Sequence, residues 1–281
     1  MNLLDINELS SDDIYRIFSS ADEIKSGMHE NFLKGKTFVL FFPESSIRTR
    51  ITFEIGIKSL GGDCIMFPSE ALDKKEELKD VIKYIENWAH GVIVRHADFS
   101  KIRDLASHSK IPVINAMTSV NHPCEVLSDL YAISKRKEHF QNLSYTFVGP
   151  AGNICRSWLT AAEVLDFKFN HVCLKGHELR TDSDNYQFYT ELDEIIKVSE
   201  VVLTDSLPDE FRNEQYIAEY QVTLERMKLA PNGALLNPCP PFFRAMEVSE
   251  EVISSEYFVG YTFKKDLLFV QQAIIIQCLL N

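Results

Sequence analysis

The sequence predicts an α/β protein with two doubly wound parallel-sheet domains, and with the C-terminal helix packing back on the first domain. Short β-branched and aromatic runs alternate with amphipathic helical segments along the chain. The alternation is interrupted by a charged segment at 135–138 and then restarts. The 281 residues suffice for one large or two medium domains. We therefore expect one domain over 1–137, a second over 138–264, and a returning helix over 265–281.

The first half contains five helical segments and four strands by pattern. Ser10 and Ser11 precede the amphipathic run 14–24, which predicts a capped helix. Four strands are expected at 36–42, 63–67, 91–95 and 112–116, and four further helices at 49–60, 78–88, 99–107 and 126–137. The charged stretch 70–77 is expected to form an exposed loop.

The second half repeats the alternation. We expect strands at 144–149, 171–174, 201–204 and 234–237, and a helix at 153–165 that follows a glycine turn. The last helix, about 265–280, is apolar on most faces, so we expect it to be buried.

Charge and cysteine usage exclude several classes of protein. A net charge of −12 argues against a general nucleic-acid binder and against a protein of anionic membrane surfaces. No apolar run is long enough for a membrane span, and the acidic N-terminal residues do not match a signal peptide. Six cysteines without a C-x-x-C pair suit a reducing cytoplasm and favour neither a disulfide framework nor a zinc site. We expect a cytoplasmic location, no metal and no cofactor.

The run 46–50 (SIRTR) lies between the expected strand 36–42 and the expected helix 49–60. Two hydroxyl groups and two guanidinium groups therefore gather at a helix N-terminus, where unpaired backbone N–H groups and the helix dipole favour an anion. The planar fork of arginine matches phosphate oxygens. For such a run alone, a capped surface helix with two solvated arginines is an equally good interpretation.

Other candidate residues stand where expected strands end. Arg95 ends one strand, and His122 precedes a helix next to Pro123. Ligands of open α/β sheets bind at the carboxyl ends of the strands, so these positions point to a ligand site. In the second half, the positions after expected strands are held by Asn153, Asp205 and Cys239.

These segments resemble, in order, motifs of the aspartate/ornithine carbamoyltransferase family. The run 46–50 resembles that family's S-T-R-T-R, and 122–130 (HPCEVLSDL) is similar to H-P-x-Q-x-L-x-D-L. The segment 149–162 resembles G-D-x-x-N-V-x-x-S-L-x-x-A-A of the ornithine branch, and 204–205 and 237–240 occupy the places of its T-D and H-C-L-P. The resemblance covers nearly the whole chain.

The resemblance implies transfer of the carbamoyl group of carbamoyl phosphate to an amine, with release of phosphate. It implies Arg48, Arg95 and His122 as catalytic residues. The implied carbamoyl-phosphate site consists of Ser46, Arg48, Thr49, Lys75, Arg95, His122 and Glu125, and the implied acceptor site consists of Asn153, Asp205 and Cys239.

The segment 73–78 (DKKEEL) resembles K-K-G-E-T-L of the aspartate branch, in which a lysine reaches the active site of the neighbouring subunit. The resemblance therefore implies a homotrimer with shared active sites, with Lys75 as the shared residue. A solvated charged loop is an equally good interpretation of this segment.

Departures from the family pattern bear on the acceptor and on activity. Glu125 replaces a glutamine, Ile47 replaces a threonine, and Pro241 stands where the family has an arginine. No S-M-G run follows Asp205, and the C-terminal helix lacks an arginine over 267–272. An aspartate acceptor needs cationic partners for its second carboxylate, so an ornithine-like acceptor fits better.

Two alternatives remain open on the sequence alone. One is a catalytically silent paralogue that binds a small anion as a sensor or assembly partner. The other is a dinucleotide-binding oxidoreductase, which ranks lower because no G-x-G-x-x-G run follows a strand.

Overall fold

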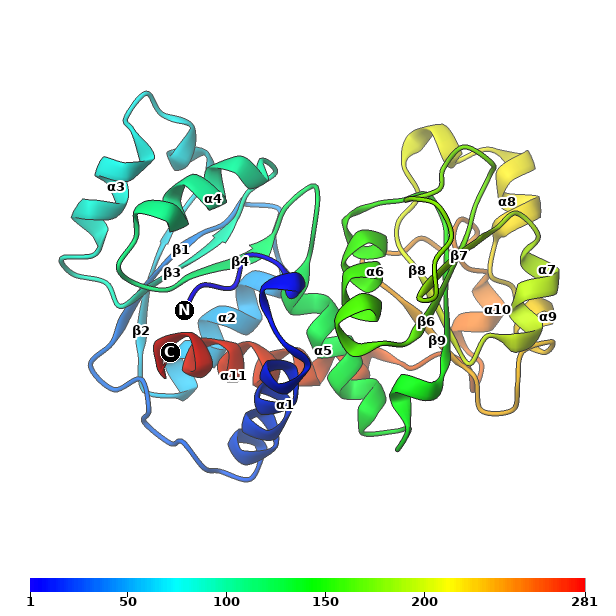
Figure 1. Ribbon diagram of the computed structural model, residues 1–281, viewed down its shortest axis with the longest axis horizontal. Coiled ribbons are helices and arrows are strands. Elements are labelled where there is room, and N and C mark those ends of the chain that lie inside the picture. Colours follow the sequence, from blue (N-terminus) through cyan, green and yellow to red (C-terminus); the bar gives the residue numbers. More distant parts are fainter. Residues whose placement is uncertain (281) are drawn as a thin grey trace. The chain divides into compact units, whose positions relative to one another are not determined.

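The computed structural model describes residues 1–280 (Figure 1). The chain divides into two compact units. The first comprises Met1–Ala132 and the segment from Lys265 onward, and the second comprises Ile133–Lys264. Each unit is built on one wholly parallel sheet, which confirms the predicted fold class.

The first unit has a four-stranded sheet in the order β2-β1-β3-β4. Its strands are β1 (Thr37–Phe41), β2 (Asp63–Phe67), β3 (Gly91–Arg95) and β4 (Val113–Met117). Val39 is in register with Ile65 on one side and with Val92 on the other. The predicted strands agree with these within a residue or two, because the apolar runs of β1, β3 and β4 are buried on both faces of the sheet, whereas the edge strand β2 is partly exposed.

Helices cover both faces of this sheet (Figure 1). They are α1 (Ser11–Lys25), α2 (Arg48–Ser59), α3 (Leu78–Ile85), α4 (Phe99–His108), α5 (Pro123–Ser134) and α11 (Asp266–Leu280). The 3-10 turns η1 (Ile6–Glu8) and η2 (Ser69–Asp73) precede α1 and α3, and η6 (Tyr261–Lys265) leads into α11. One face packs on α3 and α4 through a cluster that includes Val92, Val94, Ile82 and Ile102. The predicted cap of α1 is present, because Ser10 and Asp13 form a capping box.

The C-terminal helix α11 packs against α1 and α2, as the sequence predicts. Gln272 Nε2 donates to the carbonyl of Gly56 at 2.9 Å and to Ser59 Oγ at 2.8 Å, and Lys25 Nζ lies 2.7 Å from Asp266 Oδ1. The absence of a side chain at Gly56 matters here, because a Cβ would lie 3.2 Å from Gln272 Cγ. Burial on nearly every face explains why this helix is apolar all round.

The second unit has a five-stranded sheet in the order β7-β6-β5-β8-β9. Its strands are β5 (Ser144–Val148), β6 (Lys168–Val172), β7 (Tyr186–Tyr189), β8 (Val201–Thr204) and β9 (Leu235–Pro238). The helical segments are α6 (Asn153–Leu165), α7 (Leu192–Ile195), α8 (Glu214–Tyr220), α9 (Leu224–Met227) and α10 (Glu250–Ile253), with 3-10 turns η3 (Phe140–Asn142), η4 (Ile196–Val198) and η5 (Asp209–Phe211). The predicted bounds of the helix 153–165 are confirmed.

Four sequence predictions of secondary structure were wrong in detail. The segment 70–77 is not all exposed loop: η2 ends at Asp73 and buries Leu72. The helix expected at 126–137 begins at Pro123, because proline suits the first helical turn, and ends at Ser134. The strand expected at 171–174 is β6, which begins at Lys168, and the edge strand β7 was missed because its short run is only partly buried.

Among the described residues 1–280, no helix is long and apolar enough to cross a membrane.

Candidate active site

The strand order of the first unit reverses between β1 and β3. β1 continues to β2 on one side, whereas β3 and β4 lie on the other side. Such a reversal separates the connecting loops at the carboxyl edge of a parallel sheet and leaves a crevice there, which is the usual ligand site of open α/β folds. Ser46 and Thr49 follow β1, and Arg95 ends β3, so the predicted anion-binding residues stand at this point.

Arg95 joins the two hydroxyl groups of this loop. Its Nη1 donates to Ser46 Oγ at 3.1 Å and lies 3.4 Å from Thr49 Oγ1. Ser46 and Thr49 are 2% and 4% exposed, and Arg95 is half-buried. Each hydroxyl that accepts from a guanidinium keeps its own hydrogen to donate to a ligand oxygen. The arrangement therefore offers a positive charge and two hydroxyl donors to one anion.

The N-terminus of α2 adds backbone N–H groups beside this cluster. The helix begins at Arg48, no side chain caps its first turn, and that turn holds no acidic residue. Helix dipoles at such ends favour an anion. Arg48 itself is exposed, and its side chain makes no hydrogen bond or ion pair within the described residues.

His122 follows β4, the strand next to β3, and is buried at the start of α5. The turn before it is held by polar side chains that the sequence analysis did not select. Asn121 Oδ1 accepts from Thr118 Oγ1 at 2.8 Å and from Asn115 Nδ2 at 2.7 Å, and the Asn121 N–H donates to Thr118 Oγ1 at 3.0 Å. These contacts fix the backbone that presents His122. The segment 118–121 (TSVN), with three polar residues between strand and helix, is the feature of the sequence that could have indicated this support of the turn.

Glu125 lies in the first turn of α5 and is buried. A carboxylate at a helix N-terminus is stabilised by the helix dipole, so the substitution of glutamine by glutamate is tolerated by the fold itself. Lys75 is different: it lies in the exposed segment 74–77 after η2, and its side chain makes no hydrogen bond or ion pair within residues 1–280. The structure thus joins Ser46, Thr49 and Arg95 by hydrogen bonds, whereas within the described residues the side chains of Arg48 and Lys75 form no hydrogen bond or ion pair with them.

The second unit has the same kind of strand reversal as the first, but different side chains follow its strands. Its strand order reverses between β5 and β8. Asn153 is the first residue of α6 after β5, Asp205 follows β8, and Cys239 follows β9. The Cys239 N–H donates to the Thr204 carbonyl at 2.8 Å, which holds the ends of β8 and β9 together. The three predicted acceptor residues therefore lie at the carboxyl edge of three neighbouring strands.

Glu247 ties together the loops that follow Asp205 and Cys239. Its buried carboxylate accepts from the Leu207 N–H at 2.5 Å and from the Phe243 N–H at 2.6 Å. Bonds of this kind to an ionised group are stronger than neutral ones. This role cannot be recognised in the sequence, because a glutamate in a loop is usually solvated.

His171 supports the glycine turn before Asn153. Its Nε2 lies 2.8 Å from the Gly149 carbonyl, so it donates there, and Nδ1 accepts from Tyr186 Oη at 3.1 Å. Gly149 has φ 138°, a conformation that favours glycine. Burial lowers the pKa of His171 to about 4, so the ring is neutral at pH 7.

Comparison with known proteins agrees with this arrangement. Residues 1–135 match the family model of the aspartate/ornithine carbamoyltransferase carbamoyl-P binding domain, and residues 141–278 match that of the Asp/Orn binding domain. The chain is similar to the ornithine carbamoyltransferase of Akkermansia muciniphila, with 32% identity over 94% of this chain and 92% of the relative, and to that of Chromobacterium violaceum, with 30% identity over 99% and 96%.

A solved structure gives the same answer at the level of the fold. The ornithine carbamoyltransferase of Burkholderia thailandensis E264 superposes with a TM-score of 0.90 and 28% identity, covering 99% of this chain and 98% of that one. The family resemblance of the motifs is therefore confirmed, and with it the prediction of a carbamoyltransferase enzyme. The chain belongs to the aspartate/ornithine carbamoyltransferase family.

Proposed function

We propose that this protein transfers the carbamoyl group of carbamoyl phosphate to the amino group of an ornithine-like amino acid and releases phosphate. The observation that carries the proposal is the contact of Arg95 with the hydroxyls of Ser46 and Thr49 at the reversal point of the first sheet. The relatives named above are ornithine carbamoyltransferases, which supports the choice of acceptor.

The first unit supplies what the donor needs. Ser46, Arg48 and Thr49, together with the α2 N-terminus, hold the phosphate and neutralise its charge as it leaves. Arg95, His122 and the Thr49 hydroxyl donate to the carbonyl oxygen as it becomes negative in the tetrahedral intermediate. The amine nitrogen forms a bond to the carbonyl carbon, the bond from that carbon to the phosphate oxygen breaks, and phosphate leaves with the electron pair.

The second unit supplies a site of opposite sign for the acceptor. Asp205 is half-buried beside the end of β8, and its Oδ1 accepts from the Ser206 N–H at 2.8 Å, which orients the carboxylate. A carboxylate attracts a cationic amino acid and repels a dicarboxylate. We assign Asn153 and Cys239 to the same acceptor site. The ammonium of the acceptor loses one proton to solvent before it binds, and the nitrogen loses a second proton to the leaving phosphate after it has bonded to the carbonyl carbon. Glu125 adds a carboxylate to the donor site in the first unit.

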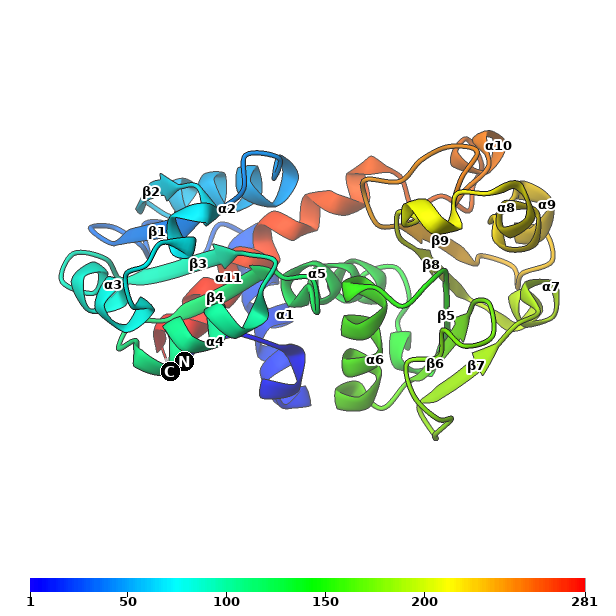
Figure 2. The same ribbon diagram turned by 90° about the horizontal axis from the view of Figure 1, so that it is seen from above.

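We also propose a homotrimer with shared active sites, in which Lys75 enters the site of a neighbouring subunit. The support is an apolar surface on α2 and the edge strand β2, which pack side by side (Figure 2). It is formed by the exposed side chains of Ile47, Ile51, Ile55, Ile65 and Phe67. Exposed apolar side chains that flank an open sheet edge are typical of an interface, and we assign them to a contact with a second copy of this chain.

We also propose a cytoplasmic location, and the state of the cysteines supports it. All six are free thiols, and five are buried, so the fold does not use disulfides. Proteins of reducing compartments keep their thiols in this form.

Phosphate release from carbamoyl phosphate tests the proposed reaction. The acceptors to compare are ornithine, acylated ornithines, lysine, putrescine and aspartate. We expect release that depends on ornithine or a close analogue and that is lost in Arg48→Ala. Binding of carbamoyl phosphate without release for any acceptor would refute a transferase and favour the silent paralogue. No binding at all would refute the anion site.

Mixed oligomers test the shared site. Arg48→Ala and Lys75→Ala chains are each expected to be inactive, and hybrids of the two are expected to regain activity because one intact site can form per pair. Inactive hybrids would rule out sharing. Sedimentation measures the trimer directly: we expect three chains in the wild-type protein and dissociation in Ile51→Asp, whereas a monomeric wild-type protein would refute the assembly.

A further inference from the structure

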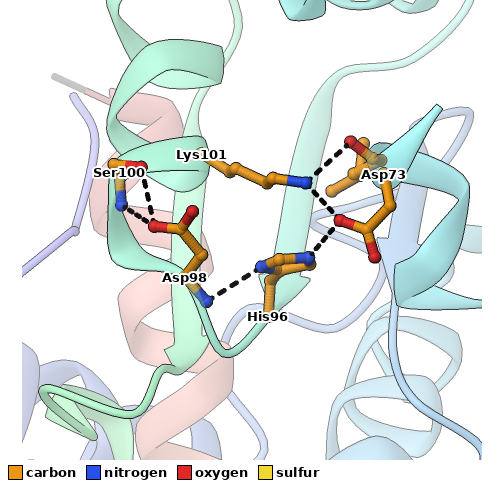
Figure 3. Close-up of polar contacts among 6 residues, drawn as sticks. Asp73, His96, Asp98, Ser100 and Lys101 are labelled. Carbon is orange, nitrogen blue, oxygen red and sulfur yellow. Dashed lines mark hydrogen bonds and ion pairs between the residues drawn. The ribbon is translucent and has the colours of Figure 1, made fainter. Parts of the chain in front are cut away.

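The side chains of Asp73, His96 and Lys101 meet where η2 ends, next to the segment that carries Lys75 (Figure 3). Asp73 is the last residue of η2, His96 follows β3, and Lys101 lies in the first turns of α4. His96 Nε2 lies 2.9 Å from Asp73 Oδ1, and Lys101 Nζ forms an ion pair with the same carboxylate. Lys101 Nζ also lies 3.5 Å from the Leu72 carbonyl. We call Asp73, His96 and Lys101 the Asp73 latch.

The backbone of α4 fixes the orientation of the histidine ring. The Asp98 N–H donates to His96 Nδ1 at 3.0 Å, so Nδ1 is an acceptor and the proton lies on Nε2, which donates to Asp73. The Asp98 carboxylate in turn caps α4 by accepting from the Ser100 N–H at 2.9 Å. The ring is therefore held from both sides, and the latch connects η2 to the start of α4.

The latch holds one end of a short exposed segment. On the N-terminal side, Ser69 and Leu72 are buried, and Asp73 is held by the latch. Residues 74–77 are all exposed, and Leu78 begins α3, whose packing holds the other end. A segment of four residues fixed at both ends has far fewer conformations than one fixed at a single end. Release of Asp73 would therefore widen the range of positions that Lys75 can occupy.

We propose that the Asp73 latch positions Lys75 for the neighbouring subunit's active site, with His96 and Lys101 as positioning residues. This rests on the proposed shared site. The exposed fraction of the Asp73 side chain, 45%, limits the strength of its ion pair with Lys101 and of its hydrogen bond with His96, so loss of one partner is expected to weaken the latch without unfolding the unit.

The variant to test is Lys101→Met, because it removes one partner of Asp73 and, unlike a change at His96, does not alter a residue adjacent to Arg95. Lys83→Met is the matched control, since it breaks a lysine–glutamate pair with Glu86 on α3 that does not touch the latch. We expect Lys101→Met to reduce the activity of the wild-type assembly about threefold, and Lys83→Met to leave it unchanged. Lys101→Arg should restore most of the activity, because arginine can still donate to the carboxylate.

Hybrid oligomers locate the effect on one chain. When Lys101→Met is placed on the Arg48→Ala chain, which contributes only Lys75, we expect the hybrid to lose activity by the same factor. When it is placed on the Lys75→Ala chain, which contributes only the Arg48 site, we expect no change. An effect that follows the Lys75→Ala chain instead would overturn the proposal, since the change would then act through Arg95.

Amide exchange separates failure of the latch from failure of the shared site. The Ala71 N–H donates to the Pro68 carbonyl at 3.0 Å within η2. We expect its exchange to become about two to five times faster in Lys101→Met than in Lys83→Met. Unchanged exchange would overturn the latch whether or not the hybrids are active. Inactive hybrids of the Arg48→Ala and Lys75→Ala chains without any third change would instead refute the shared site.

Discussion

The stability of the second unit should depend on pH through His171. The ring is wholly buried, donates to the Gly149 carbonyl and accepts from Tyr186, so it has no position for a second proton without loss of the Tyr186 contact. Its pKa is lowered from 6.5 to about 4, and burial is the largest cause. We predict that the unit loses stability as the pH falls from about 7 to about 4, and that His171→Gln removes this dependence.

The magnitude follows from the two pKa values. Above pH 6.5, His171 is neutral in both the folded and the unfolded chain, so its contribution is fully present. Between pH 6.5 and pH 4, only the unfolded chain takes up the proton, and the free energy of unfolding falls by about 1.4 kcal/mol for each pH step of one. At pH 4.5 the loss relative to pH 7.5 is about 2.5 kcal/mol, and it levels off below pH 4.

The positions of the two tryptophans provide a selective assay. Trp158 is 1% exposed in α6 and packs on Tyr145 in the second unit, whereas Trp88 is 72% exposed in the first unit. Tryptophan fluorescence during urea unfolding therefore reports mainly on the second unit. Unfolding curves at pH 7.5, 6.5, 5.5 and 4.5 give the free energy of unfolding of the wild-type protein and of His171→Gln, and their difference removes the contribution of the carboxyl groups.

Parallel pH profiles of the two proteins would refute the reasoning. They would mean that His171 accepts its proton as readily in the folded chain as in the unfolded one. A pH-independent difference between the proteins is expected in addition, because glutamine cannot reproduce both hydrogen bonds of the ring.

Three further predictions concern the reaction. Arg95→Met should lower kcat/KM for carbamoyl phosphate by about 10² to 10³ in steady-state phosphate release, because one donor to the carbonyl oxygen is lost; an effect confined to the acceptor KM would contradict the assignment. Glu125→Gln should lower the KM for carbamoyl phosphate roughly tenfold, because it removes a negative charge from an anion site; a higher KM would show that the carboxylate contributes to binding. Glu247→Gln should raise the KM for the acceptor roughly tenfold and leave the KM for carbamoyl phosphate nearly unchanged, because an amide has only one oxygen to accept from the two N–H donors. Equal changes in both KM values would rule out a role confined to the acceptor loops.

The strongly patterned parts of the fold could be predicted from the sequence. The strand at 144–148 is buried along almost its whole length, and the helix 153–165 buries the residues of one broad face. The continuous strand-forming run and the helical spacing of apolar residues reflect this burial directly. The short elements between β7 and β9 could not be predicted, because α7 and α9 are single helical turns whose stability comes from tertiary packing. The edge strand β7 has one wholly buried residue, Tyr186, and so lacks a clear alternation.

The site was predictable where a residue type itself carries the chemistry. Ser46, Thr49 and Arg95 were found because hydroxyl and guanidinium groups at strand ends suggest an anion. Supporting residues such as Asn121 and Glu247 were missed, since each acts through a backbone N–H or a neighbouring side chain that only the folded chain brings close. The sequence pattern alone could not distinguish such contacts from those of polar side chains that are simply exposed to solvent.

The polar groups held at the carboxyl edges of the two sheets differ in kind, and this fits a two-substrate reaction better than an anion sensor. At the carboxyl edge of the first sheet, the Arg95 guanidinium contacts the hydroxyls of Ser46 and Thr49 next to the start of α2. A sensor of a small anion would need only that edge. The second edge instead carries Asp205, and the buried Glu247 orders the backbone next to it. A guanidinium with hydroxyl donors in one unit and an oriented carboxylate in the other match the two substrates of a reaction that joins an amine to a phosphorylated donor, and we therefore favour the transferase over the sensor.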